Sequence, residues 1–263
     1  MSVHELQAHN TATRSENAMH HDDVAKRYGF RGGLVPGVDV YAYLTHPAAA
    51  RWGLPWLQRG RMRGRFLKPV YDGDTVRVHA TDDGDGGLAL EVRDSGGDLC
   101  ATGSASLPPD VPPRPDTAAW PSVEQPQPDD RLPAGPGSLA PGTPLGLTPH
   151  RFVVDHAAAY LGDVREPLPL YAEEGVAHPG WLLRDANYVL SGSVRMGPWI
   201  HVGSDTQHLG VVHDGDVVSC RALVTKEWEH KGHRFVELDV LHLAGDLPVA
   251  RVTHTAIHTP RAG

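Results

Sequence analysis

Residues 34–44, LVPGVDVYAYL, and residues 177–190, AHPGWLLRDANYVL, begin two stretches of the chain that repeat one another. The first stretch continues into residues 65–80, RFLKPVYDGDTVRVHA, and the second into residues 207–224, QHLGVVHDGDVVSCRALV. Each then runs through two further short apolar segments with alternating residues. The same order of segments in both stretches indicates an internal duplication.

The spacing within the two copies supports the duplication. Gly37 lies 36 residues before Gly73 of the YDGD sequence, and Gly180 lies 35 residues before Gly215 of the HDGD sequence. An unrelated pair of segments would not keep both the order and the spacing. We therefore treat the chain as two copies of one structural unit.

Each copy has the pattern of one helix followed by an antiparallel set of strands. The Pro36-Gly37 and Pro179-Gly180 pairs mark the helix starts, because proline is preorganised for the first turn of a helix. Apolar residues then recur at helical spacing, and later the period changes to two, which is typical of strands. The pattern predicts an α+β fold in which a long sheet wraps around a central helix in each copy.

A proline-rich stretch separates the copies. Between Pro108 and Pro149 lie 13 of the 23 prolines of the chain, and such a stretch cannot continue a helix or pair regularly in a sheet. We expect a domain at residues 1–107, an extended linker at 108–150 and a second domain at 151–263.

The composition excludes several classes of protein. The chain has 263 residues, 40% hydrophobic and 21% charged, which is enough apolar material for a sizeable core. Its net charge of −8 argues against nucleic-acid and membrane partners. We see no apolar run that could span a membrane and no signal-peptide core in the first twenty residues, and we expect a cytoplasmic protein. Cys100 and Cys220 lie too far apart in sequence to indicate a disulfide framework or a zinc motif.

Residues 17–37, NAMHHDDVAKRYGFRGGLVPG, resemble the MaoC-like acyl dehydratases and R-specific enoyl-CoA hydratases. The motif of that family runs G-D-x-N-P-[LIV]-H, and Asp, Ala, Gly and Gly follow its histidine at positions two, five, nine and seventeen. Counted from His20, the same residue types stand at those positions here. The resemblance covers residues 3–107 well and 151–260 more loosely. It implies a double hotdog fold.

The chain also departs from the family motif. Ser15 takes the position of the acidic residue, Arg14 that of the glycine before it, and Ala18 that of the proline. Glu16 offers a carboxylate one position along. In the second copy, Asp163 stands in a sequence similar to the acidic end of the motif. The histidine and the aspartate of the motif are therefore divided between the two copies.

The resemblance implies hydration or dehydration of an acyl thioester at the 2,3 position. In this interpretation His20 is the base, Asn17 orients the water or the thioester, and backbone amides at the following helix start hold the thioester oxygen. The missing carboxylate would come from Glu16 or from Asp163. The candidate catalytic residues are His20, Glu16, Asn17 and Asp163, and the candidate substrate-binding residues nearby are Ser15, Gly37 and Val38.

Four arginines alternate in the sequence RGRMRGRF, residues 59–66. If this segment is extended, Arg61 and Arg63 point to one side with their neighbours and could bind the phosphates of coenzyme A or an acidic carrier protein. The alternative is a solvated strand edge that prevents pairing with other sheets.

Metal binding is not indicated. The run of residues 20–23, HHDD, places adjacent side chains that rarely converge on one ion, and acids there suit a helix start. His254 and His258 share one face of a strand with apolar neighbours. We expect no metal and no cofactor, and an acyl-CoA or acyl-carrier-protein thioester as the substrate.

Two other functions remain open at this point. A hotdog thioesterase would use a carboxylate on the central helix, for which Asp39 is the candidate, although an acid in a first helical turn is also explained by the helix dipole. A non-catalytic acyl-binding or scaffold protein would explain the serine at position 15. Because one chain already supplies two hotdog units, we expect pairing within the chain and a possible homodimer.

Overall fold

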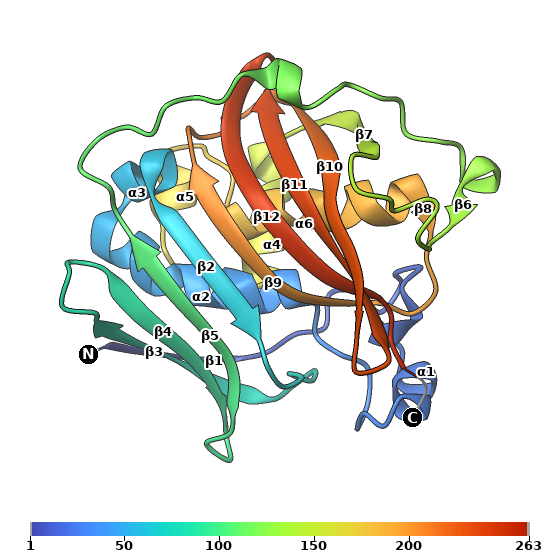
Figure 1. The fold of residues 1–263 in the computed structure, drawn as a ribbon. Coiled ribbons are helices and arrows are strands. Elements are labelled where there is room, and N and C mark those ends of the chain that lie inside the picture. The colour runs from blue at the N-terminus through green and yellow to red at the C-terminus, as the bar shows by residue number, and fades with distance from the viewer. Residues whose placement is uncertain (1, 262–263) are drawn as a thin grey trace.

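The computed structural model describes residues 2–261, and in these residues the two copies form one continuous sheet. Its ten strands follow the order β1-β3-β4-β5-β2-β9-β12-β11-β10-β7. Each half contributes five strands in the same relative order, and antiparallel pairing of β2 with β9 joins the halves. Figure 1 shows this sheet with the N-terminal half in blue to green and the C-terminal half in yellow to red.

The elements of the first half are β1 (Ser2–Gln7), η1 (Ala18–His20), α1 (Asp22–Arg27), α2 (Gly37–Trp52), α3 (Leu54–Arg59), β2 (Arg61–Phe66), β3 (Thr75–Asp82), β4 (Leu88–Asp94) and β5 (Leu99–Ser106). The connection contains η2 (Thr117–Ala119), η3 (Pro128–Asp130) and β6 (Leu132–Pro133). The elements of the second half are β7 (Pro144–Arg151), α4 (Val154–Asp163), α5 (Leu170–Glu173), α6 (Pro179–Ser193), β8 (Val194–Arg195), β9 (Ile200–His208), β10 (Val217–His230), β11 (His233–Ala244) and β12 (Leu247–Thr259).

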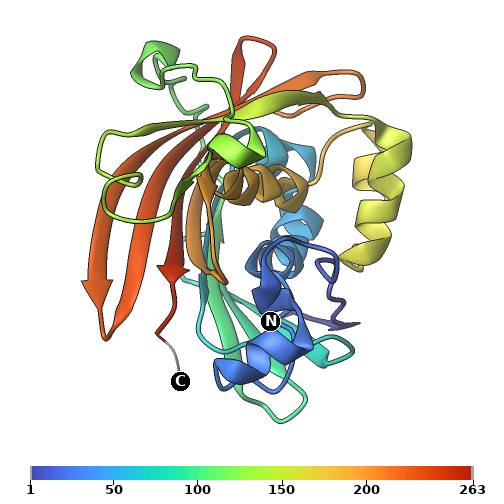
Figure 2. The same ribbon diagram turned by 90° about the vertical axis from the view of Figure 1, so that its right-hand side faces the viewer.

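The central helices α2 and α6 lie on the same face of the sheet and pack against one another (Figures 1 and 2). Strand residues alternate between this face and the other. In β3, for example, Val76, Val78 and Ala80 are buried, while Arg77 between them is exposed. One hydrophobic core runs through both halves and includes Tyr41 of α2. The α+β double hotdog architecture predicted from the repeat is present.

The two halves can be aligned by their structure or by their Pro-Gly pairs, and the two alignments differ by one residue. Leu34 bridges to Tyr71 and Val176 bridges to His213, so Leu34 corresponds to Val176. Pro36 therefore corresponds to His178, and both residues stand at the N-cap of their helix. The one-residue difference between the two sequence spacings has its origin here, because Pro179 lies inside the first turn of α6.

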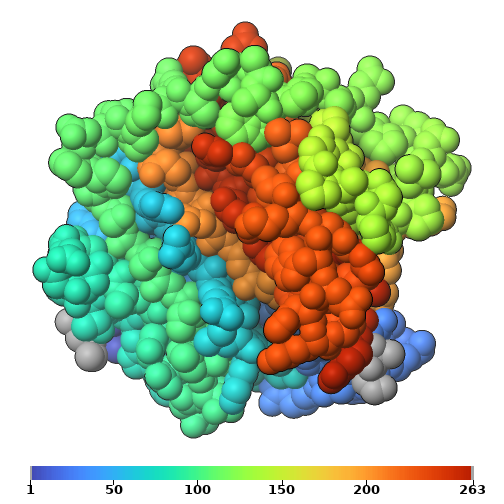
Figure 3. Space-filling view, in the orientation of Figure 1, coloured from blue at the N-terminus to red at the C-terminus, as the bar shows by residue number. Residues whose placement is uncertain are grey.

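The connection between the halves is ordered along the sheet. Trp120 is 4% exposed, packs against Leu241 and Leu243, and donates its indole N–H to the Asp239 carbonyl at 3.1 Å. Figure 3 shows the connection, in green, along the upper rim of the sheet face. β7, at 144–151, has all but its last residue in the stretch interpreted from sequence as linker, and it pairs with β10. Two prolines are tolerated in β7 because it is an edge strand.

Among residues 2–261, no helix is long and apolar enough to cross a membrane.

Candidate functional site

The segment before α2 contains η1 and α1 and fixes His20, the last residue of η1, beside the start of α2. Asn17 caps the short η1 turn, because its Oδ1 accepts a hydrogen bond from the Met19 amide at 3.2 Å. Asp22 then accepts a hydrogen bond from the Gly33 amide at 2.8 Å and ties the returning loop to the start of α1. Gly33 passes so close to His20 that an added Cβ would lie 2.2 Å from the His20 carbonyl oxygen.

His20 is held in one tautomer. Its Nδ1 lies 2.7 Å from the Leu34 carbonyl oxygen, which can only accept, so Nδ1 carries the proton and Nε2 is the basic nitrogen. The side-chain nitrogen of Asn17, Nδ2, lies 3.2 Å from Nε2, as expected for a donor facing a lone pair. Burial lowers the pKa of His20, although the hydrogen bond to Leu34 opposes this change. His20 is therefore neutral near pH 7 and can act as a base.

Asn17 joins this segment to the second half of the chain. Its Nδ2 donates to the Trp199 carbonyl at 3.0 Å, and its Oδ1 accepts from the Trp199 amide at 3.1 Å. Both residues are buried. Asn17 thus holds a backbone segment of one half against the histidine of the other, so the site forms only when the halves are packed together.

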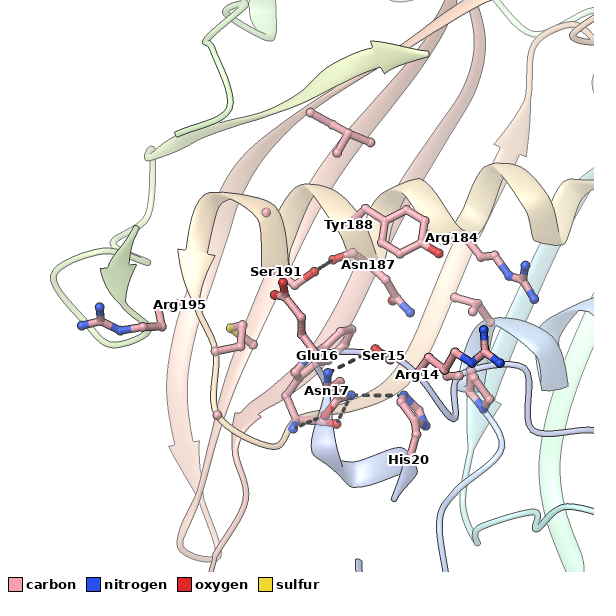
Figure 4. A pocket seen from close by; sticks show the side chains of 18 of the residues that line it. Arg14, Ser15, Glu16, Asn17, His20, Arg184, Asn187, Tyr188, Ser191 and Arg195 are labelled. Atoms are coloured by element: carbon pink, nitrogen blue, oxygen red, sulfur yellow. Dashed lines mark hydrogen bonds between the residues drawn. The ribbon is translucent and has the colours of Figure 1, made fainter. Parts of the chain in front are cut away.

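Two cavities meet at His20. Cavity 1 has a volume of about 570 Å³ and cavity 2 of about 750 Å³. The residues common to both linings are Asn17, His20, Asn187 and Trp199. In Figure 4 the Asn187 amide points from α6 toward the segment that carries Ser15 and His20. Asn187 Oδ1 is buried and has no hydrogen-bond partner among residues 2–261.

The start of α2 lies at the same junction. Gly37 lines cavity 2, and Pro36 and Val38 line cavity 1. The carbonyl of Pro36 accepts from the amides of Asp39 and Val40, whereas within the described chain the amides of Gly37 and Val38 have no acceptor. Free amides at a helix start attract an oxygen that carries negative charge.

Ser15 and Glu16 line cavity 1 but differ in orientation. Ser15 Oγ accepts a hydrogen bond from the backbone amide of Asn17 at 3.1 Å. The Glu16 side chain is 86% exposed, and its carboxylate pairs at 3.4 Å with Arg131, which also donates to the Ser191 carbonyl at the end of α6. Glu16 thus points toward the connection between the halves, while His20 lies beyond Asn17 (Figure 4).

Asp163 lies at the end of α4, outside the linings of cavities 1 and 2. Its Oδ1 lies 4.0 Å from His9 Nε2, and the Asp163 side chain is 47% exposed. The structure therefore does not bring Asp163 into the cavities that His20 lines, although the two central helices pack together.

Asp39 is fully buried in the first turn of α2. Its carboxylate accepts hydrogen bonds from Thr11 Oγ1 at 2.6 Å and from Arg184 of α6 at 2.8 Å. Thr11 and Arg184 line cavity 1, and Asp39 stands behind them. The carboxylate that a thioesterase would use is thus engaged in an ion pair between the central helices.

The arginines of β2 lie on the exposed face of the sheet. Arg61 and Arg63 both bind the Asp205 carboxylate of β9, at 2.8 Å and 2.7 Å. Arg63 and Asp205 both line cavity 2, and Arg61 is outside that lining. The segment is extended, as predicted, and its arginines point to one side of the sheet. Two of them, Arg61 and Arg63, pair with a single carboxylate of the second half.

Sequence reasoning missed Asn187, Trp199 and His201, all of which come from the second half. Asn187 and His201 line the cavities through contacts between halves, which no local pattern reveals. The spacing of Arg184, Asn187 and Ser191 places them on one face of α6, so helical periodicity could have grouped them, without showing what the face meets. In residues 2–261, no three His, Cys, Asp or Glu side chains form a group that could hold a metal ion.

Two hotdog units in one chain, with a cleft at the start of one central helix, define a double hotdog protein. No family model matches the sequence, and no curated protein matches it. Solved structures do share the fold. The chain is 16% identical to a conserved hypothetical protein from Mycobacterium tuberculosis described as having a double hotdog fold, with 97% of this chain and 95% of that one covered and a TM-score of 0.64.

Two structures named for the family suggested by residues 17–37 also match. A MaoC-like dehydratase is 12% identical over 98% of this chain and 97% of its own, with a TM-score of 0.61. A putative MaoC domain protein dehydratase from Chloroflexus aurantiacus J-10-fl is 11% identical over 100% and 95%, with a TM-score of 0.62. At these identities the likeness is one of fold, and at that level the resemblance is confirmed.

Proposed function

We propose that the protein adds water reversibly to the 2,3 double bond of an acyl thioester. The observation that carries this proposal is the neutral His20, with Nδ1 fixed on the Leu34 carbonyl, at the junction of two cavities and beside free amides of a helix start. A base and a site for an oxyanion are the two elements that this reaction needs.

The helix start would bind the thioester oxygen. When water attacks C3, the electrons of the double bond move toward the thioester carbonyl, and its oxygen gains negative charge. The Gly37 and Val38 amides can donate to this oxygen without losing other hydrogen bonds, since they have no acceptor within the described chain. Their location at the positive end of the α2 dipole adds to the effect.

His20 alone can balance the protons. The water takes the place of the Asn17 side-chain N–H at the lone pair of Nε2. Nε2 then accepts a proton from the water as the water oxygen bonds to C3, and the resulting imidazolium gives that proton to C2 of the enolate. Atoms and charge balance without a second acid. This route suits a site in which Ser15 stands where the family has its acidic residue and Asn187 faces the histidine across the junction.

The two cavities suit the two ends of a thioester. Cavity 1 is lined by four arginines and by one carboxylate, that of Glu16, in a chain whose net charge is −8. Such a lining favours the phosphates of coenzyme A or of a carrier-protein arm. Cavity 2 is lined in part by apolar side chains, among them Leu34, Val40 and Phe66, which suit the acyl group. The arginines are Arg14, Arg131, Arg184 and Arg195.

A second candidate is an acyl-thioester-binding protein without catalysis. The absence of any carboxylate among the four junction residues favours it, because most catalytic bases are oriented by an acid. A thioesterase is less well supported, since Asp39 is buried in its ion pair with Arg184.

The test is the loss of conjugated enoyl absorbance with a set of 2-enoyl-CoA thioesters of different chain lengths. His20→Ala should lower kcat/KM by about a hundredfold or more, which is typical of the loss of a general base. His21→Ala is the matched control, because His21 is the neighbouring histidine and lies outside the linings of both main cavities.

Binding measurements separate the two candidates. Turnover by the wild type and its loss in His20→Ala would support the hydratase. Tight binding of acyl-CoA without turnover of any enoyl thioester would support the binding protein. Equal turnover by wild type and His20→Ala would exclude His20 as the base.

A further inference from the structure

A hydrogen-bond chain of three buried side chains lies at the wall of cavity 2. His201 Nε2 lies 2.8 Å from Ser204 Oγ, which lies 3.2 Å from His254 Nδ1. The three residues are 5%, 4% and 0% exposed. His201 and Ser204 line the cavity together with Gly37, and His254 lies outside the lining. A polar cluster thus forms part of the wall of the proposed acyl site.

The His201 ring is fixed between two other rings. It stacks on His254 with ring centroids 4.2 Å apart and meets the Phe66 ring edge-on at 4.8 Å. Its Nδ1 is buried and has no hydrogen-bond partner within residues 2–261. A ring held in this way cannot turn Nδ1 toward water, so Nδ1 is a preorganised and unused hydrogen-bonding atom.

The absence of a side chain at position 37 leaves room for this edge of the His201 ring. A Cβ added to Gly37 would lie 2.9 Å from His201 Nδ1, too close for an unshifted side chain. Because Gly37 also begins α2, His201 Nδ1 lies close to the amides that would hold the thioester oxygen. A group bound to Nδ1 would therefore belong to the part of the substrate that enters cavity 2.

The cluster can serve as a donor or as an acceptor. The Ser204 hydroxyl donates to one histidine and accepts from the other, so reversing it exchanges the tautomers of both rings. In one arrangement His201 Nδ1 is an acceptor, and in the other it carries a proton. Burial lowers the pKa of His201 to about 3, so the ring is neutral and offers no charge to a carboxylate.

We propose that cavity 2 selects an acyl group that bears a neutral oxygen function, a hydroxyl or a keto group, and that His201 Nδ1 hydrogen bonds to this oxygen. The inference rests on the part of the proposed function that places the acyl group in cavity 2. A plain hydrocarbon chain would leave a buried polar atom unpaired, and an oxygenated chain pairs it.

The test compares ligands that cannot be hydrated. Isothermal titration calorimetry would measure the binding of hexanoyl-CoA and of three hydroxyhexanoyl-CoA isomers with the hydroxyl at carbon 4, 5 or 6. At least one isomer should bind about tenfold more tightly than hexanoyl-CoA, the gain typical of one buried hydrogen bond. This comparison uses only the wild-type protein.

Variants then assign the preference to His201. His201→Phe should bring the favoured isomer to the affinity of hexanoyl-CoA, and His201→Gln, which can still donate or accept, should keep part of the preference. His242→Phe is the matched control, because His242 is fully buried in the same sheet and lies outside cavity 2. It should keep the full preference.

The outcomes separate this inference from the proposed function. Equal affinity for all four ligands, or a preference that survives in His201→Phe, would overturn the inference and leave enoyl hydration to be judged by its own assay. A His201-dependent preference without enoyl turnover would support the inference and contradict the hydratase. A protein that binds none of the four ligands would contradict both.

Discussion

The two central helices begin in similar frameworks but in opposite environments. At the start of α2, the Gly37 and Val38 amides have no acceptor within the described chain, and each of these two residues lines one of two large cavities. At the start of α6, the Gly180 amide donates to His178 Nδ1 at 2.9 Å, and a cavity of about 40 Å³ is the space that borders His178.

The second helix start is filled by a buried polar cluster. His178 is 2% exposed and packs against Tyr160 and Tyr171, with ring centroids 5.5 Å and 4.6 Å away. Its Nε2 lies 3.8 Å from Glu166, whose other oxygen lies 3.0 Å from His46 Nδ1. The comparison teaches that duplication supplied two equivalent helix starts, of which one stays open to a ligand and the other stabilises the fold.

The largest expected effect concerns the ion pair that joins the two helices. Asp39→Ala leaves the Arg184 guanidinium without its carboxylate and should lower the free energy of unfolding by about 3–5 kcal/mol. Urea denaturation measures this change. Asp205→Ala, which breaks exposed ion pairs, is the control and should cost about 1 kcal/mol or less. Equal losses in both variants would show that the helices do not depend on this pair.

The next effect tests the closed helix start through pH. Burial alone would raise the pKa of Glu166, but the His178 and His46 imidazoles outweigh it and lower the pKa to about 2, from an ordinary value of 4.5. The stability from this shift, about 3 kcal/mol, is present above pH 4.5 and is lost as the pH falls toward 2. Thermal unfolding from pH 6 to pH 2 should therefore show a steeper fall in Tm for the wild type than for Glu166→Gln. Equal falls in Tm for the two proteins would show that Glu166 does not cause the pH dependence of stability.

A matched pair of glycine substitutions sharpens the comparison. In Gly180→Ala the new Cβ would lie 2.4 Å from the Tyr160 hydroxyl and 2.8 Å from Ala42 Cβ, and the overpacking should cost about 1–3 kcal/mol of stability. In Gly37→Ala the three heavy atoms nearest to the new Cβ all belong to His201, so we expect a drop in kcat/KM with a smaller loss of stability. Urea denaturation and kcat/KM measured on both variants check this. A larger loss of kcat/KM in Gly180→Ala than in Gly37→Ala would contradict the assignment of the substrate site to the start of α2.

The smallest effect concerns the mouth of the open site. Arg14 lines cavity 1, is exposed and forms no ion pair among the described residues. Arg14→Ala should raise KM for a CoA thioester by about two- to fivefold, because an exposed charge contributes little, and added salt should reduce the difference. Arg114, which is exposed and lies outside the linings of all three cavities, is the control. An equal or larger rise in KM for Arg114→Ala would contradict a role of Arg14 in binding the substrate.

The sequence predicted the fold because its signals are local and repeated. Helix starts, alternating strands and the two DGD turns each depend on a few neighbouring residues. Aligning the two copies by their Pro-Gly pairs places corresponding residues one position apart, because proline stands at the N-cap of α2 and inside the first turn of α6. That difference is visible only in the bridges of Leu34 and Val176.

The site was predictable only in its first half. His20 and Asn17 follow from motif spacing, and both lie at the junction of the cavities. Asn187 and His201 depend on which faces of α6 and β9 meet the first half, and Asp163 was chosen by sequence likeness although its helix turns it toward His9. Packing between halves determines all three positions, and a single sequence carries no direct record of it.

The most direct test of the open site is the pH dependence of kcat/KM for hydration of 2-butenoyl-CoA by the wild type. Since burial lowers the pKa of His20 below its ordinary value of 6.5 and no carboxylate lies at the junction, kcat/KM should rise through a single midpoint below pH 6.5 to a plateau. A midpoint above 6.5, or a bell-shaped profile with a second ionisation near neutrality, would contradict a single neutral histidine as the catalytic base.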